Sequence, residues 1–79
     1  MLTAYIRAAM HLAVYEKLDD GTYYGEIPGL QGVYADESTL ESCREELQSA
    51  LEDWLLFGLS NGFVIPPIDG IDLTVARVA

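Results

Sequence analysis

Apolar side chains recur at every third or fourth position between residues 40 and 58, and charged or polar residues occupy most of the positions between them. This spacing predicts a long amphipathic helix with one buried face. Ser38 and Glu41 match the S-x-x-E pattern of a capping box, so we expect the helix to begin at Ser38. It should end near Asn61 and Gly62, either of which can adopt the left-handed conformation of a helix C-terminus. The predicted buried stripe comprises Leu40, Cys43, Leu47, Ala50, Leu51, Trp54, Leu55 and Gly58.

Upstream of this helix the hydrophobic pattern changes to a period of two. Residues His11 to Leu18 alternate in the way that is typical of a half-buried strand. The predicted core side of this strand carries Leu12, Val14 and Leu18, with Glu16 as a charged exception on the same side.

A hairpin follows the first predicted strand. Residues 19–21 read Asp-Asp-Gly, and Asp and Gly both tolerate the positive φ angles of a tight turn. Residues 22–27 then form the partner strand, which ends at Pro28 because proline has no backbone N–H for the ladder. Gly25 lies inside this strand and indicates either a bulge or a close approach of backbone to the helix. Residues 31–35 predict a short third strand.

Both ends of the chain add one element. Residues Leu2 to Met10 place their apolar side chains at helical spacing and include three alanines, which favours a short helix, with a strand as the alternative. Near the other end, Asp69-Gly70 marks a second turn, and residues 71–78 alternate as expected of a final strand that joins the sheet.

These elements predict an α+β fold: a small antiparallel sheet, with three strands plus a C-terminal strand, covered by one long helix. The 79 residues form a single domain, residues 1–79, and 51% of them are apolar, which excludes a disordered tail. So small a chain buries a modest fraction of its surface, and oligomerisation is a common way to gain stability. We therefore expect a homo-oligomer.

The charge balance narrows the choice of partners. Thirteen acidic and four basic residues give a net charge of −9, which disfavours direct nucleic-acid binding because that binding depends on Lys and Arg. An acidic surface suits a basic protein partner, although the charge also serves solubility alone. The single cysteine, the absence of a long apolar run and the lack of a signal-sequence pattern predict a cytoplasmic protein that does not enter membranes.

Residues with catalytic chemistry give no diagnostic pattern. His11 has no nucleophile or carboxylate beside it in the sequence, and Cys43 lies on the apolar stripe, where a thiol packs as a small hydrophobic group. A two-metal nuclease site would need carboxylates from separate elements to converge. The candidates for such a site are Glu16, Glu26, Asp36 and Asp53. We expect no enzymatic activity, cofactor or metal.

The segment GTYYGEIPGLQGVYADESTLESCREELQSALEDWL, residues 21–55, resembles the HicB-like antitoxin family. The resemblance rests on the order of a hairpin turn, an aromatic strand, a P-x-L-x-G-like loop, a short acidic link and a T-L-E helix start. It covers about half of the chain. It implies a partial RNase-H-like fold without nuclease activity, and binding to a small basic HicA-type toxin whose active surface the antitoxin covers.

This sequence differs from the family pattern at both ends. Because few residues follow the long helix, we expect no DNA-binding domain of the kind that many members carry, and we expect the segment TAYIRAAM to be an added helix or a lengthened first element. From the predicted exposed faces we expect the partner-binding residues to be Tyr24, Glu26, Tyr34, Asp36 and Glu37. The alternatives are a stand-alone homo-oligomer of the same family without a toxin partner, and a metal-dependent nuclease.

Overall fold

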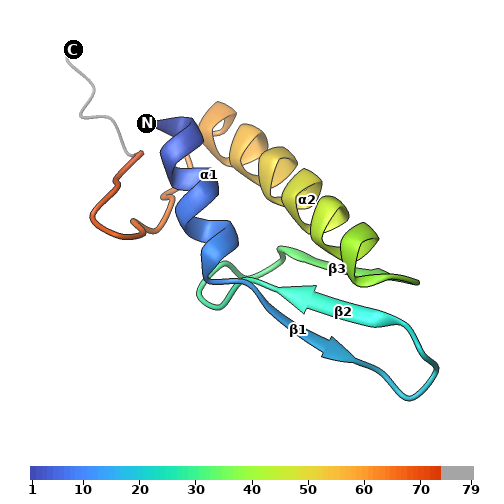
Figure 1. Ribbon diagram of the computed structural model, residues 1–79. Coiled ribbons are helices and arrows are strands. Elements are labelled where there is room, and N and C mark those ends of the chain that lie inside the picture. The colour runs from blue at the N-terminus through green and yellow to red at the C-terminus, as the bar shows by residue number, and fades with distance from the viewer. Residues whose placement is uncertain (74–79) are drawn as a thin grey trace, which may run out of the picture.

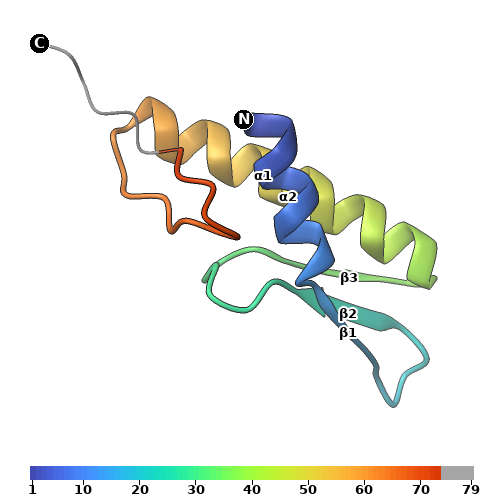
Figure 2. The same cartoon turned by 60° about the vertical axis from the view of Figure 1, so that its left-hand side comes forward.

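The computed structural model describes residues 1–73 and consists of a three-stranded antiparallel sheet with two helices on one side of it (Figure 1). α2 packs across β2 and β3, and α1 crosses beside α2, as the rotated view in Figure 2 also shows. The α+β class and the long covering helix are therefore as predicted. The elements are α1 (Leu2–His11), β1 (Val14–Lys17), β2 (Tyr23–Glu26), β3 (Tyr34–Glu37) and α2 (Leu40–Ser60).

The N-terminal segment is a helix, which confirms the helical interpretation of residues 2–10 over the strand alternative. Its buried side includes Tyr5 and Ala9, and the Tyr5 hydroxyl donates a 2.6 Å hydrogen bond to the carbonyl oxygen of Pro66. The helix continues through His11, so the prediction that a strand begins there was wrong by three residues. The apolar residues at the boundary fit either element, and packing of α1 against the core decides between them.

The strand faces are the reverse of the prediction for β1. Val14 is 51% exposed, whereas Tyr15 packs against the core, so Glu16 lies on the solvent side together with Val14. Alternation with period two defines two faces without telling which one is buried. The space above Gly25 determines which face of β1 is buried, because the Tyr15 ring fills it. A Cβ atom at Gly25 would lie 2.8 Å from Cδ1 of Tyr15 and 3.1 Å from Sγ of Cys43. Gly25 stays in register with Tyr15 and Ala35, so it makes room for a ring and forms no bulge.

The third strand begins three residues later than predicted, at Tyr34. The preceding segment, expected to start the strand at Gln31, is a compact loop whose buried side chains are Ile27, Leu30 and Val33. Backbone hydrogen bonds from the amide of Leu30 to Ile27 and from the amide of Val33 to Leu30 close two successive turns. The loop thus contributes apolar side chains to the core without joining the ladder.

α2 is capped one residue later than predicted. Thr39 is the N-cap: its Oγ1 accepts a 3.0 Å hydrogen bond from the backbone amide of Ser42. The capping box of Ser38 and Glu41 does not form, because Ser and Thr are both good caps and Thr39 has the extended backbone that the position requires. At the other end Gly62 takes φ +71°, as the sequence predicted.

The buried stripe of α2 contains Cys43, Leu47, Leu51, Leu55 and Gly58. Three members of the predicted stripe are less covered: Leu40 is exposed, and Ala50 and Trp54 are half-buried at the edge of the core. The predicted final strand is not seen in the described residues, where Asp69 and Gly70 form a turn and Ile68 pairs with Ile71 alone. The rest of that prediction, residues 74–78, lies outside the described part of the chain.

Candidate functional site

Both helices of residues 1–73 lie on one side of the sheet, so no described helix covers its other face. The antiparallel register places Glu16, Tyr24 and Asp36 in one cross-strand row and Val14, Glu26 and Tyr34 in the next. We call these six residues the open face. All are exposed except Tyr24, which is half-buried. On the opposite side of the sheet, Tyr15, Tyr23 and Ala35 belong to the core or pack against it.

Two tyrosines on neighbouring strands form the centre of the open face. The rings of Tyr24 and Tyr34 stack with centroids 6.2 Å apart and an interplanar angle of 23°. They occupy diagonal positions, which bulky aromatic side chains can bridge across an antiparallel pair. Partial desolvation raises the pKa of Tyr24, and the neighbouring Glu26 carboxylate and Tyr34 raise it further. The Tyr24 phenol therefore remains a neutral hydrogen-bond donor at physiological pH.

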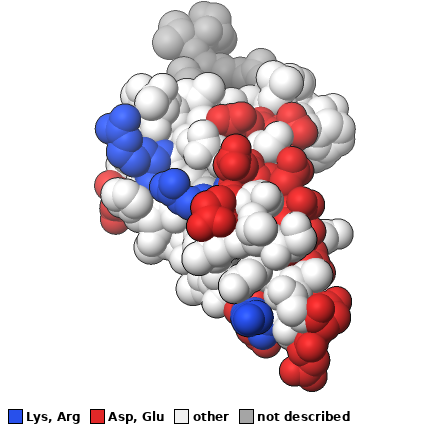
Figure 3. Space-filling model, turned by 45° about the vertical axis from the view of Figure 1, so that its right-hand side comes forward, with Lys and Arg blue, Asp and Glu red and all other residues white. Residues whose placement is uncertain are grey.

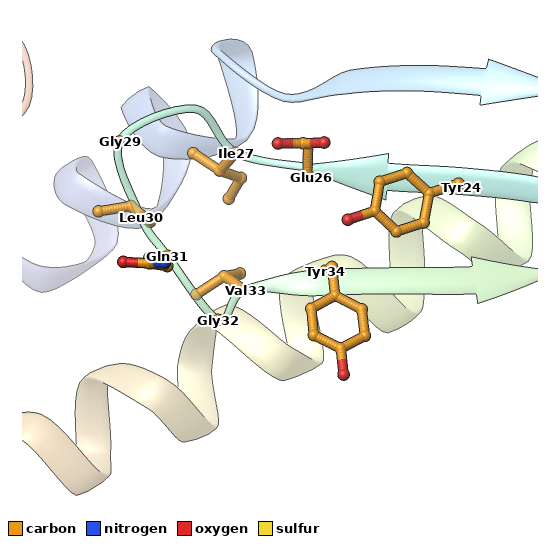
Figure 4. Close-up of a pocket in the computed structure, with 9 residues that line it drawn as sticks. All are labelled: Tyr24, Glu26, Ile27, Gly29, Leu30, Gln31, Gly32, Val33 and Tyr34. Atoms are coloured by element: carbon orange, nitrogen blue, oxygen red, sulfur yellow. The ribbon is translucent and has the colours of Figure 1, made fainter.

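A shallow cavity of about 450 Å³ extends from this tyrosine pair. Figure 4 shows the two rings and Glu26 at one end, with the loop from Ile27 to Val33 curving around the other. Gly29 and Gly32 in this loop have φ angles of +90° and +96°, which glycine adopts without strain. The cavity thus combines aromatic rings, a carboxylate and the exposed backbone of a turn.

Four of the five residues predicted to bind a partner meet on this face: Tyr24, Glu26, Tyr34 and Asp36. Glu37 does not join them, because it lies on the helix side of β3, half-buried and opposite Tyr23. Glu16 also belongs to the open face, although it was not among the predicted partner-binding residues. Its charge was the available signal, since a glutamate in a half-buried strand normally points to solvent.

The carboxylates do not build a recognisable metal centre. Glu16, Glu26 and Asp36 share the open face, but Asp53 is on α2, on the other side of the sheet. Within residues 1–73, no three His, Cys, Asp or Glu side chains come together closely enough to hold a metal ion.

Cys43 packs in the core, as its position on the apolar stripe predicted. The side chain is fully buried, and its Sγ donates a 3.6 Å hydrogen bond to the carbonyl oxygen of Ala35. Burial raises the pKa of the Cys43 thiol, and the nearby negative charges of Asp36 and Glu37 raise it further. The thiol therefore stays protonated at neutral pH, whereas a nucleophilic cysteine needs to be a thiolate.

His11 belongs to a different part of the surface. It is the last residue of α1, is exposed, and lines a cavity between the helices together with Arg7 and Arg44. In the described part of the chain, neither helix has the length and hydrophobicity required to cross a membrane.

The family model described as UPF0150-like matches residues 4–66, and this chain belongs to that family. The crystal structure of TTHA0281 from Thermus thermophilus is similar, with a TM-score of 0.89 and 47% sequence identity. The alignment covers 96% of this chain and 95% of that one, so the two proteins share their whole fold. No curated protein matches this chain.

Proposed function

We propose that this UPF0150-like chain is a non-catalytic protein-interaction domain that acts as a HicB-like antitoxin in the cytoplasm. Its partner is a small basic mRNA-cleaving toxin of the HicA type, which it neutralises by covering the active surface. The observation that carries the proposal is the open face, where the stacked Tyr24 and Tyr34 stand among the carboxylates of Glu16, Glu26 and Asp36.

The two kinds of side chain have separate roles in this proposal. Tyrosine is enriched in protein interfaces because a rigid ring supplies contact area together with a polar hydroxyl. Tyr34 is 60% exposed, so a large part of its ring remains to be buried by a partner. The three carboxylates and the net charge of −9 attract a basic protein, raise the rate of encounter and discourage acidic competitors.

A ribonuclease that binds RNA must itself present Lys and Arg to the phosphates. An acidic face that binds those side chains competes directly with RNA. Occlusion therefore needs no catalysis by this chain, and the open-face carboxylates act through their charge.

The test is to mix the purified chain with a basic HicA-type ribonuclease and to measure affinity by calorimetry and residual RNA cleavage. Tyr34→Ala and Glu26→Lys should each weaken binding by about tenfold or more, since each removes a central contact of the interface. Phe57→Ala is a matched control, because Phe57 is also 60% exposed but lies on α2. Glu46→Lys is the charge control, at an exposed position of the same helix.

The wild-type complex should also weaken as salt rises, because salt screens exposed charge pairs. Open-face variants that bind and inhibit like the wild type would place the interface elsewhere. A chain that ignores every basic partner at low salt would argue against an antitoxin and for a stand-alone member of the family.

A further inference from the structure

The two helices form a second surface feature, a groove that does not involve the open face. Two cavities, of about 270 Å³ and 220 Å³, lie along the line where α1 and α2 meet. Ile6 of α1 lines both of them, so they are neighbouring parts of one groove, which we call the helix groove.

One end of the helix groove is apolar and exposed. Its walls include Leu2, Leu56 and Leu59, and 68% of the surface of Leu56 is open to solvent. Contiguous exposed apolar side chains of this kind mark interaction surfaces in soluble proteins. Among the described residues, Glu52 is the one charged residue in the lining of this end.

The other end is basic in a strongly acidic protein. Arg7 and Arg44, two of the four basic residues of the chain, line it together with His11, the only histidine. Arg44 interacts with the hydroxyl of Tyr15, which is neutral at physiological pH and does not cancel the positive charge of the guanidinium. Figure 3 shows a band of Lys and Arg atoms directly beside a broad area of Asp and Glu atoms. The arginines are therefore available to carboxylates from another molecule.

Along α2 the chemistry of the exposed positions is self-complementary. Every fourth residue forms a ridge that reads apolar, basic, polar, acidic, apolar, and all five members are exposed. These residues are Leu40, Arg44, Gln48, Glu52 and Leu56. Ridges of this spacing are the ones that pack between helices in the commonest class of helix–helix contact.

We propose that the helix groove binds a second copy of this chain, with the two α2 helices antiparallel and a two-fold axis near Gln48. A two-fold interface uses the same patch on both partners, so each contact occurs twice. Arg44 of one copy then meets Glu52 of the other, and the two leucines at the ends of the ridge approach each other across the axis.

The charged residues that line the helix groove favour a second copy of this chain over a partner that is only hydrophobic. Two chains of net charge −9 repel each other over most of their surfaces. The helix groove offsets this repulsion, because Arg7 and Arg44 stand near the position of the partner's acidic residue. The dimer also removes Leu56 from water, and so small a chain benefits from extra buried apolar surface.

Charge-reversal variants test the arrangement by sedimentation or native mass measurement over a wide range of concentration. One chain has a mass of 8.7 kDa, and the wild type should show about twice that value. Arg44→Glu and Glu52→Arg should each shift the species to monomer, because each places like charges opposite one another twice. The double variant R44E/E52R should dimerise again, and an equimolar mixture of the two single variants should form a heterodimer.

Lys17→Glu and Glu46→Arg are the matched controls. They make the same charge changes at exposed positions outside the groove, and both variants should remain dimeric. Circular dichroism of each variant checks that the monomers are folded. A wild type that is monomeric at every concentration would overturn the proposal, and so would a dimer that survives both single reversals or a double variant that stays monomeric.

The outcome is independent of the antitoxin proposal. Binding of a basic toxin is measured on the open face with Tyr34→Ala, whereas dimerisation is measured on α2 with Arg44→Glu. A monomer that still binds the toxin would refute the helix groove alone.

Discussion

The ring of Tyr15 on β1 occupies the space that a side chain at Gly25 of β2 would need, and an added Cβ would lie 2.8 Å from its Cδ1 atom. The Sγ atom of Cys43 approaches the same point from α2, at 3.1 Å. Strand, neighbouring strand and helix thus meet at one glycine. The contact fixes which face of β1 is buried and leaves Val14 and Glu16 on the open face.

Gly25→Ala should therefore destabilise the fold by about 1–3 kcal/mol, the usual cost of overpacking a filled core. Urea denaturation of the variant and the wild type measures the difference. In the double variant with Tyr15→Ala the cost of the added methyl group should fall, because the ring it displaces is gone. Fully additive effects would mean that Tyr15 does not restrict this position.

The hydrogen bond between Tyr5 and Pro66 ties α1 to the segment that follows α2. Tyr5→Phe keeps the buried ring and leaves the carbonyl oxygen of Pro66 without this donor. The free energy of unfolding should fall by about 0.5–1.5 kcal/mol, the usual net contribution of one hydrogen bond. Tyr34→Phe is the control, because the ring of Tyr34 is exposed, and it should leave stability unchanged. Equal effects of the two substitutions would argue against the bond.

Alkaline pH should weaken the fold through Cys43. Burial raises the pKa of its thiol in the folded protein above its usual value of 9.0. At pH values between the pKa of the thiol in the unfolded chain and its higher pKa in the folded chain, the unfolded chain releases a proton that the folded chain retains. Stability is therefore full below pH 9.0 and declines as pH rises above it. Burial also raises the pKa of Tyr5 above its usual 10.0, which extends the decline to higher pH.

Cys43→Ser separates the thiol from the tyrosines, since serine retains a hydroxyl donor for the carbonyl oxygen of Ala35 and does not ionise in this range. Denaturant unfolding at a series of pH values should give a shallower decline just above pH 9.0 for this variant. An identical pH profile for both proteins would show that Cys43 ionises equally in the folded and unfolded states.

The start of α2 provides a test with an adjacent control. Thr39→Ala removes the side-chain acceptor for the amide of Ser42 and should cost about 0.5–2 kcal/mol. Ser38→Ala should have almost no effect on the free energy of unfolding. Thermal unfolding of both variants distinguishes the two possible caps. If Ser38 were the cap, as the S-x-x-E pattern predicts, Ser38→Ala would cost more stability than Thr39→Ala.

An element was predictable from the sequence where its hydrophobic pattern is compatible with only one buried face. The 3/4 spacing from Cys43 to Gly58 admits one buried face, and the turns at Gly21 and Gly70 follow from residue types that tolerate positive φ. Adjacent Ser38 and Thr39 are both good caps, so the residue types alone left that boundary undecided. Val33 was expected in a strand because β-branched residues favour strands, but together with Leu30 it belongs to a loop that packs in the core.

The candidate site was only partly predictable, for a geometric reason. Tyr24, Glu26, Tyr34 and Asp36 could be chosen as exposed residues, but the cross-strand register alone shows that they adjoin one another and that Glu37 points away. The helix groove could not be predicted from the sequence. Arg7 and Arg44 are far apart along the chain, and only the crossing of α1 over α2 brings them to one cavity.

Trp54 illustrates how position on a stripe differs from depth in the core. Helical spacing predicts it as a core anchor, for which truncation to alanine costs about 3–5 kcal/mol. It is half-buried at the edge of the cluster, whereas Leu51, one turn earlier, is fully buried. We therefore expect Leu51→Ala to cost about 2–5 kcal/mol and Trp54→Ala to cost less than a core tryptophan would.

Denaturant unfolding of the two variants at a concentration where both are monomeric compares these costs directly. A cost for Trp54→Ala that exceeds that of Leu51→Ala would mean that the indole packs more tightly against the core than its exposure indicates. A nearly neutral Trp54→Ala would mean that the indole ring contributes little to the stability of one chain. The ring would then contribute to an interface in which a second molecule covers it. In that case the same substitution should weaken association while leaving the monomer folded.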